Sequence, residues 1–225
     1  MWIDDQIIKQ CSQPQVLETW VPQSPCVILG SANRPERECQ VGYCQRAGID
    51  ILKRYGGGGT VLLHSGCVIL SYGCWVKQTF DNHRYFQILN KAIVDTLGSR
   101  WPEFKSLHQK GISDIAYELR KVCGTSLFRS KSYLLFQASI LVESKVEEIE
   151  AALLHPSREP DYREGKAHRE FLLGLQDIDT TANTSEVKLT LHHGFLASIK
   201  NGLREDFVPP NEKHIPYLLK RAGLK

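Results

Sequence analysis

Four consecutive glycines, Gly56 to Gly59, separate two apolar segments of this 225-residue chain. Glycine loses more conformational entropy on folding than any other residue, so an uninterrupted run needs a structural reason. These residues alone leave two explanations open. Without side chains, the backbone can approach a ligand closely and turn its amides toward an anion, with Arg54 as a further partner for a phosphate or carboxylate. Alternatively, the run is a flexible hairpin loop that binds nothing.

The length and composition of the chain indicate one main folded domain. A chain of 225 residues with 42% apolar and 24% charged residues can bury a large core. No segment reaches the ~20 apolar residues of a membrane helix, and the first residues lack the pattern of a signal peptide. The net charge is +3, and the basic residues are scattered rather than gathered into a stripe. We therefore expect a soluble, cytoplasmic protein that binds neither nucleic acid nor membrane.

The cysteines argue against both a disulfide framework and a zinc site. Their number is odd and no CxxC pair occurs, in a chain that is large for a disulfide scaffold. We expect seven reduced thiols, most of them buried as small apolar side chains: Cys11, Cys26, Cys39, Cys44, Cys67, Cys74 and Cys123.

Hydrophobic periodicity predicts a mixture of strands and helices. The expected strands are residues 16–20, 26–30, 49–54, 60–64, 67–72, 114–117, 120–123, 133–142 and 187–191. The expected helices are residues 1–10, 35–47, 82–99, 146–154, 167–173, 194–202 and 212–221, with a polar loop at 179–185. Many strands are joined by hairpins rather than by helices, which favours an α+β fold over a parallel doubly wound sheet.

Three motifs occur in order along the chain. The first is KRYGGGGTV at residues 53–61, followed by a His-Ser-Gly-Cys segment. The second combines GISDI at residues 111–115 with RKVCG at residues 120–124, and the third is the segment of residues 156–171. The first two resemble motifs of the lipoate–protein ligase family, and the third is similar to a segment found in one branch of that family. The resemblance extends over residues 20–171, which is most of the chain.

That resemblance implies a mixed, largely antiparallel β-sheet flanked by α-helices, the catalytic fold shared with biotin ligases and octanoyltransferases. It implies that lipoate attacks the α-phosphorus of ATP, with Mg²⁺, to give lipoyl-AMP and pyrophosphate. The lysine of a lipoyl-carrier protein then takes the lipoyl group as an amide. We expect residues 1–175 to form this catalytic domain and residues 176–225 an extension packed on it, too short for the independent core of an accessory domain. The chain would then use a separate accessory subunit or close the site with its final helix.

The resemblance also assigns candidate site residues. Lys121 matches the lysine that contacts the lipoyl carboxylate and the α-phosphate, a bridging role that suits a compact ammonium group. Asp114, seven residues before Lys121, is the candidate carboxylate to meet Mg²⁺ or to orient the incoming amine. The expected ATP and lipoyl-AMP contacts are Arg54, Gly57, Gly58, Gly59, Thr60, Val61, Leu62, Lys121, Gly124 and Ser126.

Other readings of single residues stay open. Without the resemblance, Lys121 is a solvated strand lysine that shares a face with Cys123 and not with its neighbours. We expect His64 to be a polar turn residue. Arg163 and His168 are expected to be structural. His192 and His193 fall outside the resemblance and are expected at the surface.

The chain departs from the family pattern at residues 63–67, 124–127 and 137–140, around the expected acyl tunnel. These departures concern the acyl substrate more than the fold. Two rival functions follow. One is an ATP-independent octanoyl or lipoyl transferase that forms a cysteine thioester, for which Cys123 is the nearest thiol to Lys121. The other is a non-catalytic ligase subunit.

Overall fold

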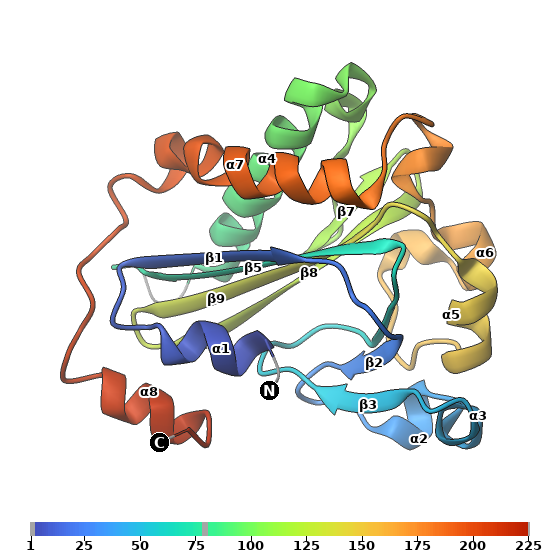
Figure 1. The fold of residues 1–225 in the computed structure, drawn as a ribbon, viewed down its shortest axis with the longest axis horizontal. Helices are drawn as coiled ribbons and strands as arrows, with labels where there is room; N and C mark the ends of the chain where they lie inside the picture. Colours follow the sequence, from blue (N-terminus) through green and yellow to red (C-terminus); the bar gives the residue numbers. More distant parts are fainter. Residues whose placement is uncertain (1–2, 78–80, 225) are drawn as a thin grey trace.

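Two β-sheets form the centre of the structure, a computed structural model that describes residues 3–77 and 81–224 (Figure 1). The large sheet has six strands in the order β1-β5-β9-β8-β7-β6, and the small sheet has three in the order β3-β2-β4. Every neighbouring pair in the large sheet is antiparallel, and the β2–β3 pair of the small sheet is parallel. The predicted α+β fold with a mixed, largely antiparallel sheet is confirmed.

The strands of the large sheet are β1 (Gln15–Trp20), β5 (Cys67–Trp75), β9 (Tyr133–Leu141), β8 (Arg120–Ser130), β7 (Asp114–Tyr117) and β6 (His108–Lys110). Those of the small sheet are β3 (Asp50–Lys53), β2 (Cys26–Leu29) and β4 (Val61–Leu63). All nine residues of β5 are buried. A strand buried on both faces reads as an unbroken apolar run, so β5 is the middle of a layered core.

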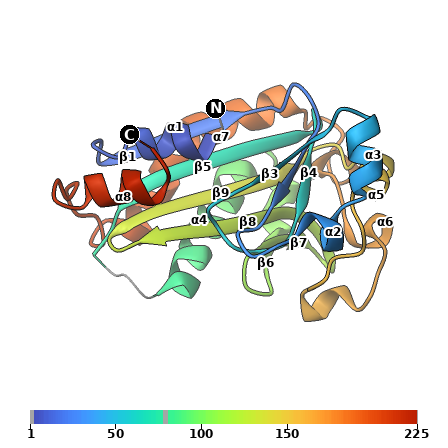
Figure 2. The same ribbon diagram turned by 90° about the horizontal axis from the view of Figure 1, so that it is seen from below.

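Helices cover both faces of the large sheet. The long helices α4 (Asn82–Arg100) and α7 (Thr184–Leu203) pack on one face, where the main apolar core lies. On the opposite face lie α1 (Ile3–Lys9), α8 (Ile215–Arg221) and the small sheet (Figure 2). The shorter helices are α2 (Pro35–Glu38), α3 (Val41–Arg46), α5 (Val146–Ala152), α6 (His168–Phe171) and three 3₁₀ turns at Pro102–Ser106, Asp161–Arg163 and Leu175–Asp177.

The strand predicted at residues 187–191 is wrong, because this segment lies inside α7. The buried residues of α7 recur every fourth position, which is the spacing of one helix face rather than of a strand: Val187, Leu191, Phe195, Ile199 and Leu203. The predicted loop at residues 179–185 ends where Asn183 caps α7 by accepting the Glu186 N–H. The single helix predicted at residues 35–47 is instead the pair α2 and α3. Met1 and Trp2, in the predicted first helix, lie outside the described residues.

The glycine run is not a hairpin turn. The strands before and after it, β3 and β4, pair with β2 on opposite sides and not with each other. The run therefore crosses the end of β2 and faces the large sheet. Likewise, β4 and β5 belong to different sheets, although only a short turn separates them.

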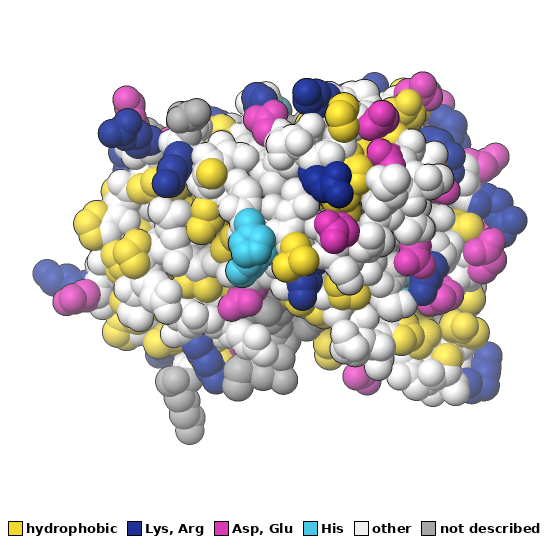
Figure 3. All heavy atoms as spheres, turned by 45° about the horizontal axis from the view of Figure 1, so that its top comes forward, with side chains coloured by type: hydrophobic (Ala, Val, Ile, Leu, Met, Phe, Trp, Pro, Cys, Tyr) yellow, Lys and Arg dark blue, Asp and Glu magenta, His cyan; other side chains and the backbone are white. Residues whose placement is uncertain are grey.

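On the face that Figure 3 shows, basic and acidic side chains are interspersed with apolar ones. No helix within residues 3–77 and 81–224 combines the length and the apolar character that crossing a membrane requires.

Candidate active site

The glycine run forms a loop with unused backbone amides. Gly58 has a φ of +94°, in the region that favours glycine. A Cβ on Gly30, at the end of β2, would lie 2.1 Å from the Gly58 carbonyl oxygen, so the two backbones meet where no side chain fits. In the part of the chain that the structure describes, no protein acceptor takes the amides of Gly58, Gly59 or Thr60. These amides are available to an anion.

The Arg54 side chain holds this loop in place through hydrogen bonds to its carbonyls. Its guanidinium donates to the carbonyl of Gly57 from Nε at 3.1 Å and from Nη2 at 2.7 Å, and Nη2 also donates to Gly59 at 2.7 Å. Nη1 donates to the Ile28 carbonyl at 3.4 Å. Burial lowers the pKa of Arg54 to about 10, an effect that the nearby Asp4 carboxylate opposes. In this arrangement Arg54 acts on the loop rather than projecting freely into the pocket.

Asp4, from the first helix, lies fully buried under the loop and was not foreseen from the sequence. It accepts the Tyr55 N–H at 3.1 Å and the Gln137 Nε2–H at 2.5 Å. Burial raises the pKa of Asp4 to about 6, although these hydrogen bonds and Arg54 oppose the shift. The Tyr55 hydroxyl also bonds Asp5 at 2.9 Å and the Ala222 carbonyl at 2.6 Å, so both ends of the chain support the loop.

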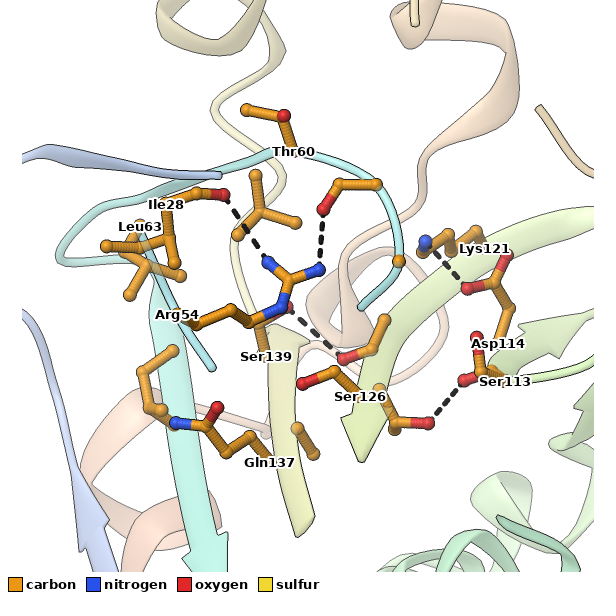
Figure 4. Close-up of a pocket in the computed structure, with 17 residues that line it drawn as sticks. Ile28, Arg54, Thr60, Leu63, Ser113, Asp114, Lys121, Ser126, Gln137 and Ser139 are labelled. Atoms are coloured by element: carbon orange, nitrogen blue, oxygen red, sulfur yellow. Dashed lines mark hydrogen bonds and ion pairs between the residues drawn. The ribbon is translucent and has the colours of Figure 1, made fainter. Parts of the chain in front are cut away.

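Lys121 lies across the pocket from the loop, in an ion pair (Figure 4). Its ammonium is 2.7 Å from Oδ1 of Asp114, and the Tyr162 hydroxyl donates to the other carboxylate oxygen at 2.9 Å. The ammonium rests over Gly124, where a Cβ would be 3.0 Å from Nζ. The Lys121 side chain is 22% exposed, which leaves it open to a ligand.

The prediction that Lys121 and Cys123 share a strand face is wrong. Ile115 pairs with Cys123 but Ala116 pairs with Lys121, so β8 carries one extra residue, Val122, at this point. Such a bulge reverses the alternation of side chains. Lys121 consequently lines the pocket, whereas Cys123 is 1% exposed in the main core. Burial raises the pKa of the Cys123 thiol, which disfavours a reactive thiolate.

Two cavities meet at Lys121. The inter-sheet pocket lies between the sheets and encloses about 590 Å³, including its mouth; its walls include Ile28, Leu63, Ile69, Ser126, Gln137 and Ala138. The helix-side pocket lies toward α5 and α6 and has about 640 Å³ of empty space, open solvent at its mouth included; its walls include Glu38, Leu62, Ile149, Leu153, Arg163, His168 and Phe171. Both cavities are lined by Thr60, Val61, Lys121, Gly124 and Ser139.

Most of the residues proposed from the sequence border these cavities. The inter-sheet pocket is lined by Arg54, Gly58, Gly59, Thr60, Val61, Asp114, Lys121, Gly124 and Ser126. Leu62 lines the helix-side pocket, and Gly57 lines neither. Among the residues expected to be structural, Arg163 and His168 also line the helix-side pocket.

Three further histidines and the cysteines are either buried or away from Lys121. His64 is buried, accepts the Gly66 N–H at 3.1 Å, and has its pKa lowered to about 4, mainly by burial. His192 and His193 are exposed on α7. All seven cysteines are free, and six of them are buried. Cys67, at the wall of the helix-side pocket, has its pKa raised by burial to about 12.

Asp114 does not fit a metal ligand well. Both of its carboxylate oxygens are engaged, one by Lys121 and the other by Tyr162. No cluster of three or more metal-binding side chains occurs within residues 3–77 and 81–224. The geometry favours Asp114 as the group that orients Lys121.

A family model for the lipoyl protein ligase A/B catalytic domain matches residues 1–196. Among curated proteins, the inactive lipoate–protein ligase 2 of Plasmodium falciparum is 25% identical, over 78% of this chain and 55% of its own length. Lipoate-protein ligase A subunit 1 of Thermoplasma acidophilum is 26% identical, over 84% of this chain and 74% of its own length. The chain thus spans little more than half of the first relative and three quarters of the second.

Solved structures share the fold. A bi-partite lipoate protein ligase from T. acidophilum, studied with its E2 lipoyl domain, superposes with a TM-score of 0.72 at 20% identity, over 97% of this chain and 86% of that chain. A lipoate-protein ligase A bound with ATP gives 0.70 at 20% identity over the same shares. A T. acidophilum protein with bound lipoic acid gives 0.69 at 19% identity, over 98% and 90%.

Proposed function

This chain belongs to the lipoyl protein ligase A/B catalytic-domain family, and from that premise we propose that it is the catalytic subunit of an ATP-dependent lipoate–protein ligase. One observation carries the proposal: two cavities of different character meet at the ammonium of Lys121. Forming an acyl-adenylate requires a carboxylate and an α-phosphate to be held together beside positive charge. Activation of this kind depends mainly on positioning and electrostatics.

We assign the inter-sheet pocket to the acid and the helix-side pocket to the nucleotide. An acyl chain fits a slot between two sheets, with Ile28, Leu63 and Ile69 along its walls. A purine needs polar partners at its edge, and Glu38, Arg163 and His168 lie among the apolar walls of the helix-side pocket. The structures with bound ATP and with bound lipoic acid support both ligands.

In the proposed first step, a carboxylate oxygen of lipoate bonds to the α-phosphorus of ATP and the bond to pyrophosphate breaks. The Lys121 ammonium neutralises charge on the carboxylate and on the phosphorus centre. The N–H groups of Gly58, Gly59 and Thr60 donate hydrogen bonds to phosphate oxygens. In the second step, the ε-amine of a carrier lysine attacks the acyl carbon, and AMP leaves. Mg²⁺ would be held mainly by the triphosphate and by water, and it would supply neutralising charge to the phosphates.

Asp114 and Tyr162 are positioning residues in this scheme. The carboxylate of Asp114 holds the ammonium of Lys121 at 2.7 Å, and Tyr162 fixes that carboxylate from the other side. Arg54 acts on the ligand through the glycine loop, whose carbonyls it holds.

We propose a lipoyl domain as the acceptor and a separate accessory subunit as a partner. The T. acidophilum relative is itself named a subunit, and its structural counterpart is described as bi-partite. We propose residues 1–175 as the catalytic domain and residues 176–225 as its extension, supported by the packing of α7 against the main core. Free thiols fit a reducing, cytoplasmic compartment.

One rival has specific support. A non-catalytic subunit is favoured by the inactive Plasmodium relative and by the departures at residues 63–67, 124–127 and 137–140. The cysteine transferase is disfavoured, since both Cys123 and Cys67 are buried and have raised thiol pKa values.

The test is lipoylation of a panel of lipoyl domains with lipoate and ATP, with and without the accessory subunit. The ligase predicts lipoate-dependent pyrophosphate release that Lys121→Ala abolishes. Lys91→Ala, at an exposed lysine on α4, is the matched control and should keep full activity. Pyrophosphate release that is absent under every condition, despite binding of lipoate and ATP, would establish the non-catalytic subunit instead.

A further inference from the structure

The inter-sheet pocket carries an unexpected polar pair. Ser126 on β8 and Gln137 on β9 are directly opposite each other in the sheet, and both line this pocket. They are only 6% and 8% exposed, so the pair is nearly enclosed by protein. An acyl chain that is purely apolar would leave such groups without partners in a dry cavity.

Contacts on the protein side fix what this pair offers to a ligand. The Gln137 amide nitrogen donates to buried Asp4 at 2.5 Å, which leaves the amide oxygen as an acceptor. Across residues 3–77 and 81–224, no group donates to that oxygen and none bonds the Ser126 hydroxyl. Burying a polar group without a partner is costly, so a ligand with its own polar group fits best.

The strand geometry gives the position of that polar group along the ligand. Gly124 and Ser139 form the pair beside the Lys121 ammonium, where the acid's carboxylate is expected. Ser126 and Gln137 are two residues further along the same strands, on the same face. Two residues of a strand span about 7 Å, which an extended alkyl chain with bonds of about 1.5 Å covers in five or six bonds.

We infer that Ser126 and Gln137 select a medium-chain carboxylic acid that carries a hydrogen-bonding group near its sixth carbon. The inference rests on the proposed function, since it takes Lys121 as the carboxylate site. A hydroxyl satisfies both groups, because it accepts from Ser126 and donates to Gln137. Lipoate has a sulfur at its sixth carbon, a weak acceptor for Ser126 alone. Octanoate satisfies neither. The expected order of preference is 6-hydroxyoctanoate, then lipoate, then octanoate.

The experiment measures binding of these three acids to the full chain by calorimetry, and in parallel their ability to drive pyrophosphate release with ATP. A site that hydrogen-bonds a hydroxyl rejects an analogue that lacks it. We expect 6-hydroxyoctanoate to bind at least about tenfold more tightly than octanoate. Ser126→Ala and Gln137→Leu should each remove most of that preference, and Ser106→Ala, at an exposed serine outside both pockets, should keep it.

The outcomes separate the two proposals. Equal binding of the three acids, or tighter binding of octanoate, overturns the inference even where pyrophosphate release proceeds. A preference for 6-hydroxyoctanoate without any pyrophosphate release supports the inference and contradicts the ligase. Absence of binding by all three acids overturns the inference. The ranking in the unaltered chain is decisive by itself if either variant fails to fold.

Discussion

Arg54 and Lys121 line the same pocket with the same charge, yet the protein holds them in different ways. Arg54 is 8% exposed, and its guanidinium is taken up by backbone carbonyls of the glycine loop and β2. Lys121 is more exposed and has one carboxylate partner, Asp114. Arg54 thus fixes the position of the loop, whereas the ammonium of Lys121 stays available to a ligand. Of the two cations that line this pocket, one therefore supports the loop and the other faces the ligand space.

The largest effect is expected at Lys121. Replacing it with alanine removes the charge beside the reacting atoms, and loss of one such group lowers kcat/KM by about 10²–10³-fold. The thermal unfolding midpoint should also fall, because the buried Asp114 carboxylate loses its cation, so kcat/KM is compared at a temperature where both proteins are folded. Lys121→Arg should recover only part of the activity, since a planar guanidinium cannot take the same bridging position. Activity within tenfold of the unaltered chain would contradict this assignment.

At Arg54, a substitution should mainly lower the free energy of unfolding rather than act directly on the reaction. Arg54→Met leaves buried carbonyls and the Asp4 carboxylate without their cation, which should lower the free energy of unfolding by about 4 kcal/mol. Arg37→Met, at an exposed arginine on α2, is the control and should change it by less than about 0.5 kcal/mol. Urea unfolding measures both. A stable Arg54→Met protein that has lost ATP binding would make Arg54 a direct ligand contact.

The raised pKa of Asp4, the carboxylate near Arg54, can be tested through the pH dependence of stability. Burial raises the pKa of Asp4 from 3.8 to about 6, so the folded state holds this proton more tightly than the unfolded state. Stability then falls as pH rises from about 4 to 6, with a total change of about 3 kcal/mol. Asp4→Asn removes that contribution.

His64 and His168, whose pKa values burial lowers to about 4, change stability in the opposite direction over the same range. The useful quantity is therefore the difference in unfolding free energy between the unaltered chain and Asp4→Asn. Relative to Asp4→Asn, the unaltered chain should lose free energy of unfolding between pH 4 and pH 7. A difference that does not vary with pH would mean that Asp4 titrates normally.

The smallest effect on activity is expected at Tyr162, which holds the Asp114 carboxylate beside Lys121. Tyr162→Phe removes the hydrogen bond to Asp114 and loosens the group that orients the ammonium. Loss of one such bond costs about 1 kcal/mol, or roughly fivefold in kcat/KM. Tyr217→Phe, at a tyrosine that is 51% exposed, should have no effect. A fall equal to that of Lys121→Ala would instead place Tyr162 among the catalytic groups.

The sequence predicted most of the sheet-forming segments, because apolar periodicity and glycine positions are local signals, but it missed β6 and placed a strand inside α7. The sequence-based prediction failed where one inserted residue, or a contact between distant segments, determines the structure. The extra residue Val122 in β8 reverses the face of Lys121 relative to Cys123, and alternation alone cannot reveal it. Asp4 reaches the glycine loop from about 50 positions away in the chain, a contact that only tertiary packing creates.

The central claim is that one ligand spans both pockets and meets Lys121 between them. Calorimetry with a lipoyl-adenylate analogue, in which a sulfamate replaces the phosphate, tests it without any accessory subunit. We predict binding at one site, competition by lipoate and by ATP separately, and a loss of affinity of at least about tenfold in Lys121→Ala. Binding that ignores either competitor, or that Lys121→Ala leaves unchanged, would contradict the account.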